Sequence, residues 1–315
     1  MLCRMMAIRR VGPMGSVSPI DSLVLGMAVD RFAVYSSLAL IFGVGAFTTV
    51  LAPARVACEI ARRLRPFVDV AVTVFLVGTL LWLPLEAGQI NGAWDGAFQP
   101  DTLQTLLSAT TSGTLWLERT AVCLLLVAVR FALPGRPGRQ MVFLLSAGSL
   151  VSLVFVGHAA MDDGWLGDLH EANDAVHILA ASGWIGCLIA LVPCMDMLDD
   201  PDLRRQACVS LIRFSTVGHV AVALVLLTGV VNTYLVLGRW PFHLASLYQV
   251  LLLGKVALAF GMVALALMNR YAVVPRLRAR GAAAIADLRR LTIAELGLAA
   301  GVLALVSLFG LLDPL

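Results

Sequence analysis

The sequence predicts an all-α membrane protein, a polytopic bundle of about eight transmembrane helices. Of its 315 residues, 60% are hydrophobic and 14% are charged, and the mean hydropathy is +0.90, which is far from the usage of soluble proteins. Apolar runs of about 20 residues, the length that crosses the hydrocarbon core as a helix, recur along the chain. Uninterrupted runs of this length exclude a β-barrel, so helices are expected to satisfy the backbone hydrogen bonds.

Eight apolar runs divide the chain. They lie at about 28–51, 66–88, 114–133, 140–160, 175–198, 209–237, 247–270 and 290–312. Residues 1–27 contain Pro13, Pro19 and Asp21 and have no long apolar core, so we expect an N-terminal tail rather than a cleaved signal peptide. Residues 28–315 are expected to form a single transmembrane domain.

The basic residues predict the orientation. Sixteen of the 23 Lys and Arg residues fall in the connections after the first, third, fifth and seventh runs or at the helix ends beside them. Because basic loops are retained on the cytoplasmic side, we expect both termini to lie outside, on the periplasmic side of a bacterial membrane. Arg4, Arg9 and Arg10 favour the opposite orientation, but the internal loops outweigh them. The net charge of +3 then reflects topology and not nucleic-acid binding.

Metal-ligating side chains gather in the outer connections. Four of the five histidines fall there or at the adjoining helix ends: His158, His170, His177 and His243. If the chain is helical at His170, then His170, Asp174 and His177 share one helix face at i, i+4 and i+7. His158 and Met161 then converge on them from the preceding helix. Imidazole with thioether favours copper, and solvated loop residues are the alternative.

Polar residues within the apolar runs need a polar partner or a functional role, because hydrocarbon does not solvate them. His219 and Asn232 lie in the sixth run, and Lys255, the only lysine, lies in the seventh. We expect them either to join helices through a polar network or to line an ion path. Glu86 and Asp30 are the expected partners of Lys255.

Soft sulfur ligands lie at the inner end of the fifth run. Cys194, Met195 and Met197 form a possible exit for Cu(I), with flexible core packing as the alternative. The remaining cysteines do not pair in the outer loops, and free thiols are expected.

Several short segments together carry a family resemblance. They are His177 to Gly186, Arg213 to Ser215, Thr228 to Asn232, Leu253 to Lys255, Met268 to Arg270, Pro275 to Leu277, and Leu288 to Arg290 followed by Glu295. In order and spacing these segments resemble the CopD/PcoD family of bacterial copper resistance and copper uptake membrane proteins. The resemblance is strongest over residues 157–312, with a weaker part around Arg31 and Gly43 to Phe47.

The resemblance implies a multi-pass protein of the bacterial inner (plasma) membrane that takes part in copper homeostasis. It implies copper, as Cu(I) or Cu(II), and contact with membrane lipid. It also implies a periplasmic copper-binding partner of the CopC type, which we expect to be a separate protein. Family members typically have Gly-Gly after the Trp-Ile pair, whereas this chain has Gly186 and Cys187, which is a small departure.

These observations predict a copper protein that takes copper from the periplasmic side and moves it into or across the membrane. His158, Met161, His170 and His177 would bind the metal, and His219, Asn232 and Lys255 would line or brace the route. Heme ligation in a membrane cytochrome and a non-transporting, copper-responsive scaffold are the alternatives. An enzyme is not expected, because no nucleophile and base pair stands out, and no nucleotide-binding loop is present.

Overall fold

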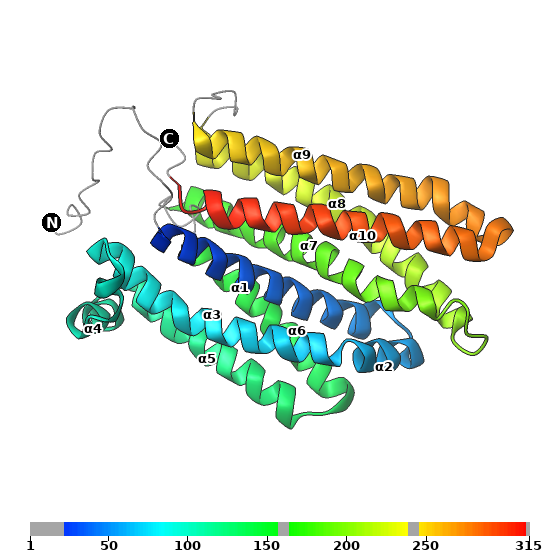
Figure 1. The fold of residues 1–315 in the computed structure, drawn as a ribbon, viewed down its shortest axis with the longest axis horizontal. Coiled ribbons are helices and arrows are strands. Elements are labelled where there is room, and N and C mark those ends of the chain that lie inside the picture. Colours follow the sequence, from blue (N-terminus) through cyan, green and yellow to red (C-terminus); the bar gives the residue numbers. More distant parts are fainter. Residues whose placement is uncertain (1–21, 157–163, 239–245, 313–315) are drawn as a thin grey trace.

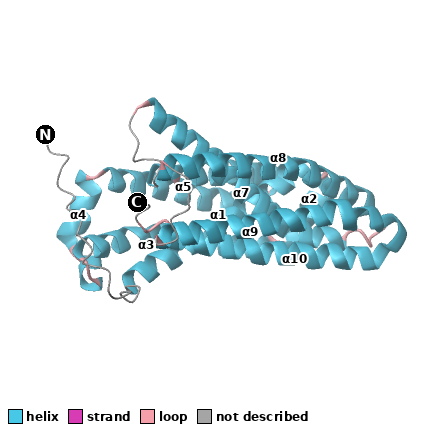
Figure 2. Cartoon of the chain, turned by 90° about the horizontal axis from the view of Figure 1, so that it is seen from above, coloured by secondary structure: helices cyan, strands magenta, loops and turns pink. Residues whose placement is uncertain are grey.

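A computed structural model describes residues 22–156, 164–238 and 246–312 of the protein. Over these ranges every regular element is helical and none is a strand. The long helices lie side by side along one axis in an elongated bundle (Figures 1 and 2). The predicted all-α class is therefore confirmed.

Over the described ranges, eight helices of 18 residues or more make up the bundle. Their bounds are α1 (Ser22–Ala46), α3 (Arg65–Asn91), α5 (Thr111–Ala132), α6 (Gly135–Ser152), α7 (Trp165–Asp196), α8 (Arg204–Leu237), α9 (Leu247–Met268) and α10 (Leu277–Phe309). Six of these are long and apolar enough to cross a membrane: α1, α3, α7, α8, α9 and α10. The other two, α5 and α6, are shorter than most and carry Arg119, Arg136 and Arg139.

Short helical segments connect the long ones. They are η1 (Phe47–Leu51), α2 (Ala54–Arg63), η2 (Trp94–Phe98), α4 (Pro100–Ala109), η3 (Val154–Val156), η5 (Asn269–Val273) and η6 (Val274–Arg276). The sequence reasoning did not foresee α2 or α4, because neither is long enough to give a membrane signal. Pro100 opens α4 at a position where the missing N–H costs nothing. Gly281, with φ 29° and ψ −105°, bends α10 near its start.

The two ends of the bundle differ in charge. The first turns of α1 and the last turns of α10 lie at one end (Figure 1), and the Arg31 guanidinium of α1 donates a hydrogen bond to the Gly310 carbonyl oxygen just after α10 (3.2 Å). At the opposite end Asp196, the last residue of α7, pairs with Arg63 of α2 (3.1 Å) and with Arg289 of α10. The Arg31 contact thus joins the end of α10 to α1, and the Arg289 contact joins α10 to α7.

Helix α7 packs closely against α1. Gly43 of α1 and Gly186 of α7 face each other, and a Cβ at Gly43 would overlap the Gly186 backbone. A Cβ at Gly186 would overlap the Ala39 carbonyl oxygen. The Cys187 thiol donates a hydrogen bond to the Gly43 carbonyl oxygen (3.4 Å) across the same crossing. Small residues thus let the two backbones approach closely, as membrane helices commonly do.

The outward-facing sides of α8 and α9 are apolar and exposed. On α8 these exposed side chains include Val217, Val220 and Leu227, and on α9 they include Phe260. An exposed apolar surface of this kind fits contact with lipid. Such a surface on two of the long helices is what a membrane-embedded bundle requires.

We expect Gly186→Ala to destabilise the protein, because the added methyl group has no space between α1 and α7. Overpacking of this kind costs about 1–3 kcal/mol. The measurement is the temperature at which the buried thiols of Cys123, Cys187 and Cys194 become reactive toward a dye in detergent.

Gly297→Ala in α10 is the matched control, since a Cβ there meets no atom within 4 Å. It should leave that temperature unchanged or raise it slightly. An equal decrease in both variants would contradict the close crossing of α1 and α7.

Candidate functional site

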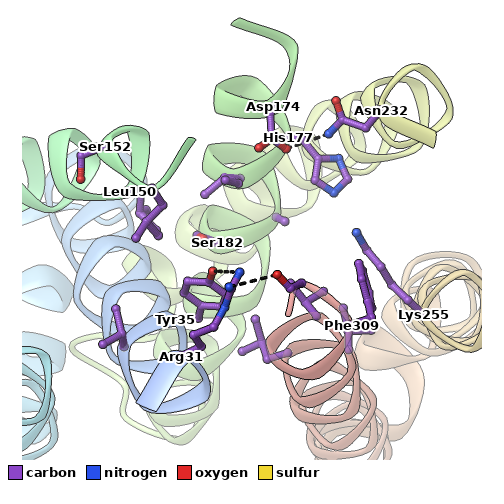
Figure 3. Close-up of a pocket in the computed structure, with 18 of the residues that line it drawn as sticks. Arg31, Tyr35, Leu150, Ser152, Asp174, His177, Ser182, Asn232, Lys255 and Phe309 are labelled. Atoms are coloured by element: carbon purple, nitrogen blue, oxygen red, sulfur yellow. Dashed lines mark hydrogen bonds between the residues drawn. The ribbon is translucent and has the colours of Figure 1, made fainter. Parts of the chain in front are cut away.

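A cavity of about 290 Å³ lies between the long helices, toward the end of the bundle where α1 begins and α10 ends. All eight long helices contribute lining residues. Its polar side chains come mainly from α1, α7, α8 and α9, as Figure 3 shows. We refer to it as the central cavity.

Helix α7 supplies the histidines of the central cavity. The helix begins at Trp165, so the chain is already helical at His170, as the spacing argument required. His170, Asp174 and His177 all line the cavity. His170 is only 2% exposed and His177 only 9%. The alternative of solvated loop residues therefore does not describe these two histidines.

The hydrogen bonds of His177 define which ring nitrogen is left for a ligand. Its Nδ1 lies 2.9 Å from the Thr228 hydroxyl of α8. That hydroxyl donates its single proton to the Leu224 carbonyl oxygen (2.5 Å), so it accepts the proton of Nδ1–H from the imidazole. The lone pair of the neutral ring then resides on Nε2. A histidine oriented in this way by its second nitrogen is typical of metal ligands.

An amide network joins α7 to α8 beside His177. Asn173 donates through Nδ2 to the Thr228 carbonyl oxygen (3.0 Å) and to Oδ1 of Asn232 (2.5 Å). Asn232 in turn donates through its own Nδ2 to Oδ1 of Asp174 (2.8 Å). The network fixes the Asp174 carboxylate at the wall of the cavity (Figure 3). The sequence prediction that Asn232 joins helices is consistent with these contacts.

Lys255 of α9 reaches the same cavity from the opposite wall. Its Nζ lies 5.7 Å from the centroid of the Phe309 ring, a favourable position for a cation. The carboxylate whose charge acts on it is that of Asp174. The expected partners Glu86 and Asp30 are wrong, since the charge that acts on both is that of Arg31.

Two arginines form the basic wall of the central cavity. Arg31 donates to Tyr35 (2.9 Å) as well as to Gly310. Arg119 of α5 donates through Nε to the Ser152 hydroxyl (3.2 Å) and through Nη2 to the Ser152 carbonyl oxygen (2.5 Å). The cavity therefore has histidines and the Asp174 carboxylate on the α7 side, and the guanidinium groups together with the Asp30 carboxyl group on the α1 and α5 side.

Three of the sequence-predicted residues, His158, Met161 and His243, lie outside the described residues. Within the described parts of the chain, no three His, Cys, Asp or Glu side chains come close enough to share one metal ion. His170 and His177 are seven residues apart on one helix, a rise of about 10 Å. Two histidines so placed cannot be the opposed axial ligands of one heme. His219, which the heme alternative would pair with His177 or His158, is exposed outside the central cavity, and the heme alternative is not supported.

The other predicted residues lie away from the central cavity. His219 is exposed on α8, where its Nδ1 donates to the Ser215 carbonyl oxygen (2.5 Å) and its Nε2 lies 3.5 Å from the Tyr271 hydroxyl. Cys194, Met195 and Met197 are almost fully buried in the core at the arginine-rich end. The Cys194 thiol contacts the Ala207 carbonyl oxygen of α8 at 4.0 Å.

Sequence reasoning did not assign a role to Asn173 or Thr228. The spacing of polar residues in the sequence nevertheless points to both of them. Asn173 and His177 are four residues apart on α7, and Thr228 and Asn232 are four residues apart on α8. Two polar pairs with helical spacing on consecutive membrane helices predict a polar contact between these helices.

Comparisons with known proteins agree with this architecture. Residues 20–168 match a family model described as copper resistance protein D-like, N-terminal domain, and residues 209–309 match one described as copper resistance protein D. The chain is 33% identical to inner membrane protein YebZ of Escherichia coli (90% of this chain, 97% of the relative). It is 31% identical to copper resistance protein D of Pseudomonas syringae (92% and 97%).

A more distant relative has a longer chain. Copper transport protein CutJ of Bacillus subtilis is 28% identical over 70% of this chain and 42% of its own length. No solved structure matches the chain significantly. These names describe copper resistance and transport, together with an inner-membrane location, and none describes an enzyme.

We expect Asn232→Leu to lower the free energy of unfolding by about 1–3 kcal/mol. The substitution removes the hydrogen bond that Asn232 donates to the Asp174 carboxylate and one acceptor of Asn173, and the loss of buried hydrogen bonds costs energy of this size. The measurement is reversible unfolding in mixed detergent micelles. Thr233→Val is the control, because the Thr233 hydroxyl bonds only the Gly229 carbonyl of its own helix (2.8 Å). Equal losses in the two variants would argue against the network between α7 and α8.

Proposed function

Since the chain belongs to the copper resistance protein D family, we propose that it takes copper from the periplasmic side and moves it into or across the inner membrane. Copper is the cargo, and the α7 side of the central cavity is the place where it is bound. The observation that supports this most directly is the buried His177, whose ring is held by Thr228 so that Nε2 carries the lone pair.

The proposed site extends from the outer end of the cavity inward. His170 lies nearly two helical turns closer to the start of α7 than His177. His158 and Met161, which lie outside the described residues, belong to the connection just before α7 and are proposed as further ligands. Three imidazoles and a thioether would let copper pass from ligand to ligand.

Asp174 and Lys255 are proposed to control the charge of the route. A copper ion near Asp174 would compete with the Lys255 ammonium for the same carboxylate. Asn232 would keep that carboxylate in position during the exchange. Asp174 is thus proposed as the carboxylate on which both the lysine and the copper ion act, while Asp30 is a second carboxylate at the wall of the cavity.

The inner end of the route is proposed to include Cys194, Met195 and Met197. Their sulfur atoms suit Cu(I), and they lie in the core at the arginine-rich end of α7. His219, which the sequence placed on the route, is separate from the central cavity, and its contribution can be tested by the same variants.

We propose that α5 and α6 complete eight membrane crossings and that both termini are periplasmic. The support is that α1 begins and α10 ends at the same end of the bundle (Figure 1), opposite to most of the arginines. Basic residues are concentrated on the cytoplasmic side of bacterial membrane proteins. A separate periplasmic copper-binding protein of the CopC type would then deliver copper directly to the start of α7.

The double variant His170→Ala/His177→Ala tests the copper site. We expect purified protein to lose copper affinity by at least about tenfold, because even outer-shell changes at metal sites have effects of this size. Copper accumulation in cells that carry the double variant should change together with this loss of affinity. The measurements are metal content of the detergent-purified protein and copper flux into proteoliposomes.

His219→Ala serves as the control, because it removes an exposed imidazole outside the cavity. The variant should retain copper binding, and a loss of flux alone would place His219 on the route. Full copper content in the double variant would refute the site. Copper binding by the wild-type protein without flux would favour the scaffold alternative.

The native cysteines test the topology. Cys58 and Cys208 are exposed at the arginine-rich end, whereas Cys123, Cys187 and Cys194 are buried. In a Cys3→Ser background, we expect a membrane-impermeant maleimide to label no cysteine in intact spheroplasts and to label Cys58 and Cys208 after permeabilisation. Labelling of either residue from outside would contradict a cytoplasmic arginine-rich end.

A further inference from the structure

A second cavity, of about 360 Å³, lies at the arginine-rich end of the bundle. Its walls come from α1, α2, α3, α5 and α6, and α2 lies beside the end of the bundle where α5 and α6 are connected (Figure 1). None of the residues proposed for copper binding lines it. We refer to it as the basic cavity.

Four arginines line the basic cavity, namely Arg62, Arg65, Arg130 and Arg139. Two carboxylates partly balance them. Glu59 holds Arg62 (2.7 Å) and Arg63, and their hydrogen bonds lower its pKa to about 2. Asp69 holds Arg130 (2.6 Å) and, at 3.7 Å, Arg65. The cavity thus retains an excess of positive charge.

Arg139 has no such partner. Among the described residues it forms no ion pair or hydrogen bond, and its Nε is buried without an acceptor. The Nε of Arg130 is likewise buried and without an acceptor. A buried guanidinium N–H normally finds an acceptor oxygen. Two unpaired N–H groups at one cavity therefore indicate that an acceptor from outside the protein belongs there.

The start of α6 adds backbone donors to the same cavity. Gly135 and Gly138 of its first turn are lining residues. The N-cap residue, Pro134, provides no side-chain acceptor, and the first turn contains no acidic residue. Gly135 and Arg136 offer backbone N–H groups at the start of this 18-residue helix, whereas Pro137 has none, and together with the helix dipole these groups favour an anion.

The rim of the basic cavity is apolar rather than aqueous. Phe131 and Leu133 line the cavity, and they are 62% and 47% exposed. These side chains face the surroundings of the bundle at the point where the membrane would end. A free phosphate ion gains no binding energy from an apolar rim, whereas the acyl chains of a lipid pack against it.

We propose that the basic cavity binds the phosphate group of an anionic phospholipid of the inner leaflet. Arg139 and Arg130 contact the phosphate oxygens together with the first turn of α6, and Phe131 and Leu133 contact the acyl chains. Arginine suits this role because its planar fork matches phosphate oxygens. Basic pockets between membrane helices on the cytoplasmic side are known to bind such headgroups.

The test is native mass spectrometry of the full chain in detergent, titrated with phosphatidylglycerol and, separately, with phosphatidylcholine. We expect the wild-type protein to bind phosphatidylglycerol preferentially. Arg139→Gln should weaken that binding about tenfold, the effect of losing one charge-assisted hydrogen bond, and should leave phosphatidylcholine binding unchanged. Arg139→Lys, which keeps the charge, should show a smaller loss.

Arg276→Gln is the matched control, because it removes one exposed arginine at the same end of the bundle but outside the cavity. It should bind phosphatidylglycerol as the wild type does. Arg62→Gln, on the open side of the cavity, repeats the test if Arg139→Gln does not fold, and it should also weaken binding.

Two results would overturn the proposal. One is an equal loss in Arg276→Gln and the cavity variants, which would mean that general surface charge attracts the lipid. The other is binding of inorganic phosphate as tightly as phosphatidylglycerol, which would assign the site to the free ion. Retention of the lipid preference in the presence of equimolar phosphate would support the lipid.

Discussion

Polar side chains inside a membrane protein must be paired within the protein, and the contact between α7 and α8 is where this chain meets that requirement. Thr228 accepts a hydrogen bond from His177 at its hydroxyl and one from Asn173 at its carbonyl oxygen. Asn232 connects Asn173 to Asp174. Because each group depends on the next, α7 and α8 can dock in only one register. The position of the central cavity and the direction of His177 follow from that register.

The two ends of the bundle are stabilised by different means. At one end a single guanidinium, that of Arg31, contacts the last carbonyl of the helical hairpin formed by α9 and α10. At the other end Asp196 neutralises Arg63 and Arg289 from two different helices. A carboxylate at the last residue of α7 opposes the helix dipole, so the two arginines also offset an unfavourable charge. The arginines at this end therefore stabilise the packing of the helices as well as indicating the orientation of the chain.

Composition and periodicity predicted the helical fold and most of the helix positions, because membrane helices are defined by length and hydropathy alone. The spacing of His170, Asp174 and His177 likewise predicted one shared face. The partner of Lys255 could not be predicted, since it depends on how far α9 lies from α1, α3 and α7. Helices α2 and α4 also escaped prediction, because short amphipathic segments resemble loops in composition.

The close crossing of Gly43 and Gly186 has a mechanical consequence. Two backbones in direct contact leave no clearance for sliding, so α1 and α7 move as one rigid unit. Helix α8 is held to α7 by hydrogen bonds, and the His177 ring packs against Gly229, where a Cβ would come within 3.3 Å of its Cε1 atom. Because His170 and His177 lie on α7, the rigid unit of α1 and α7 also fixes their position relative to α1.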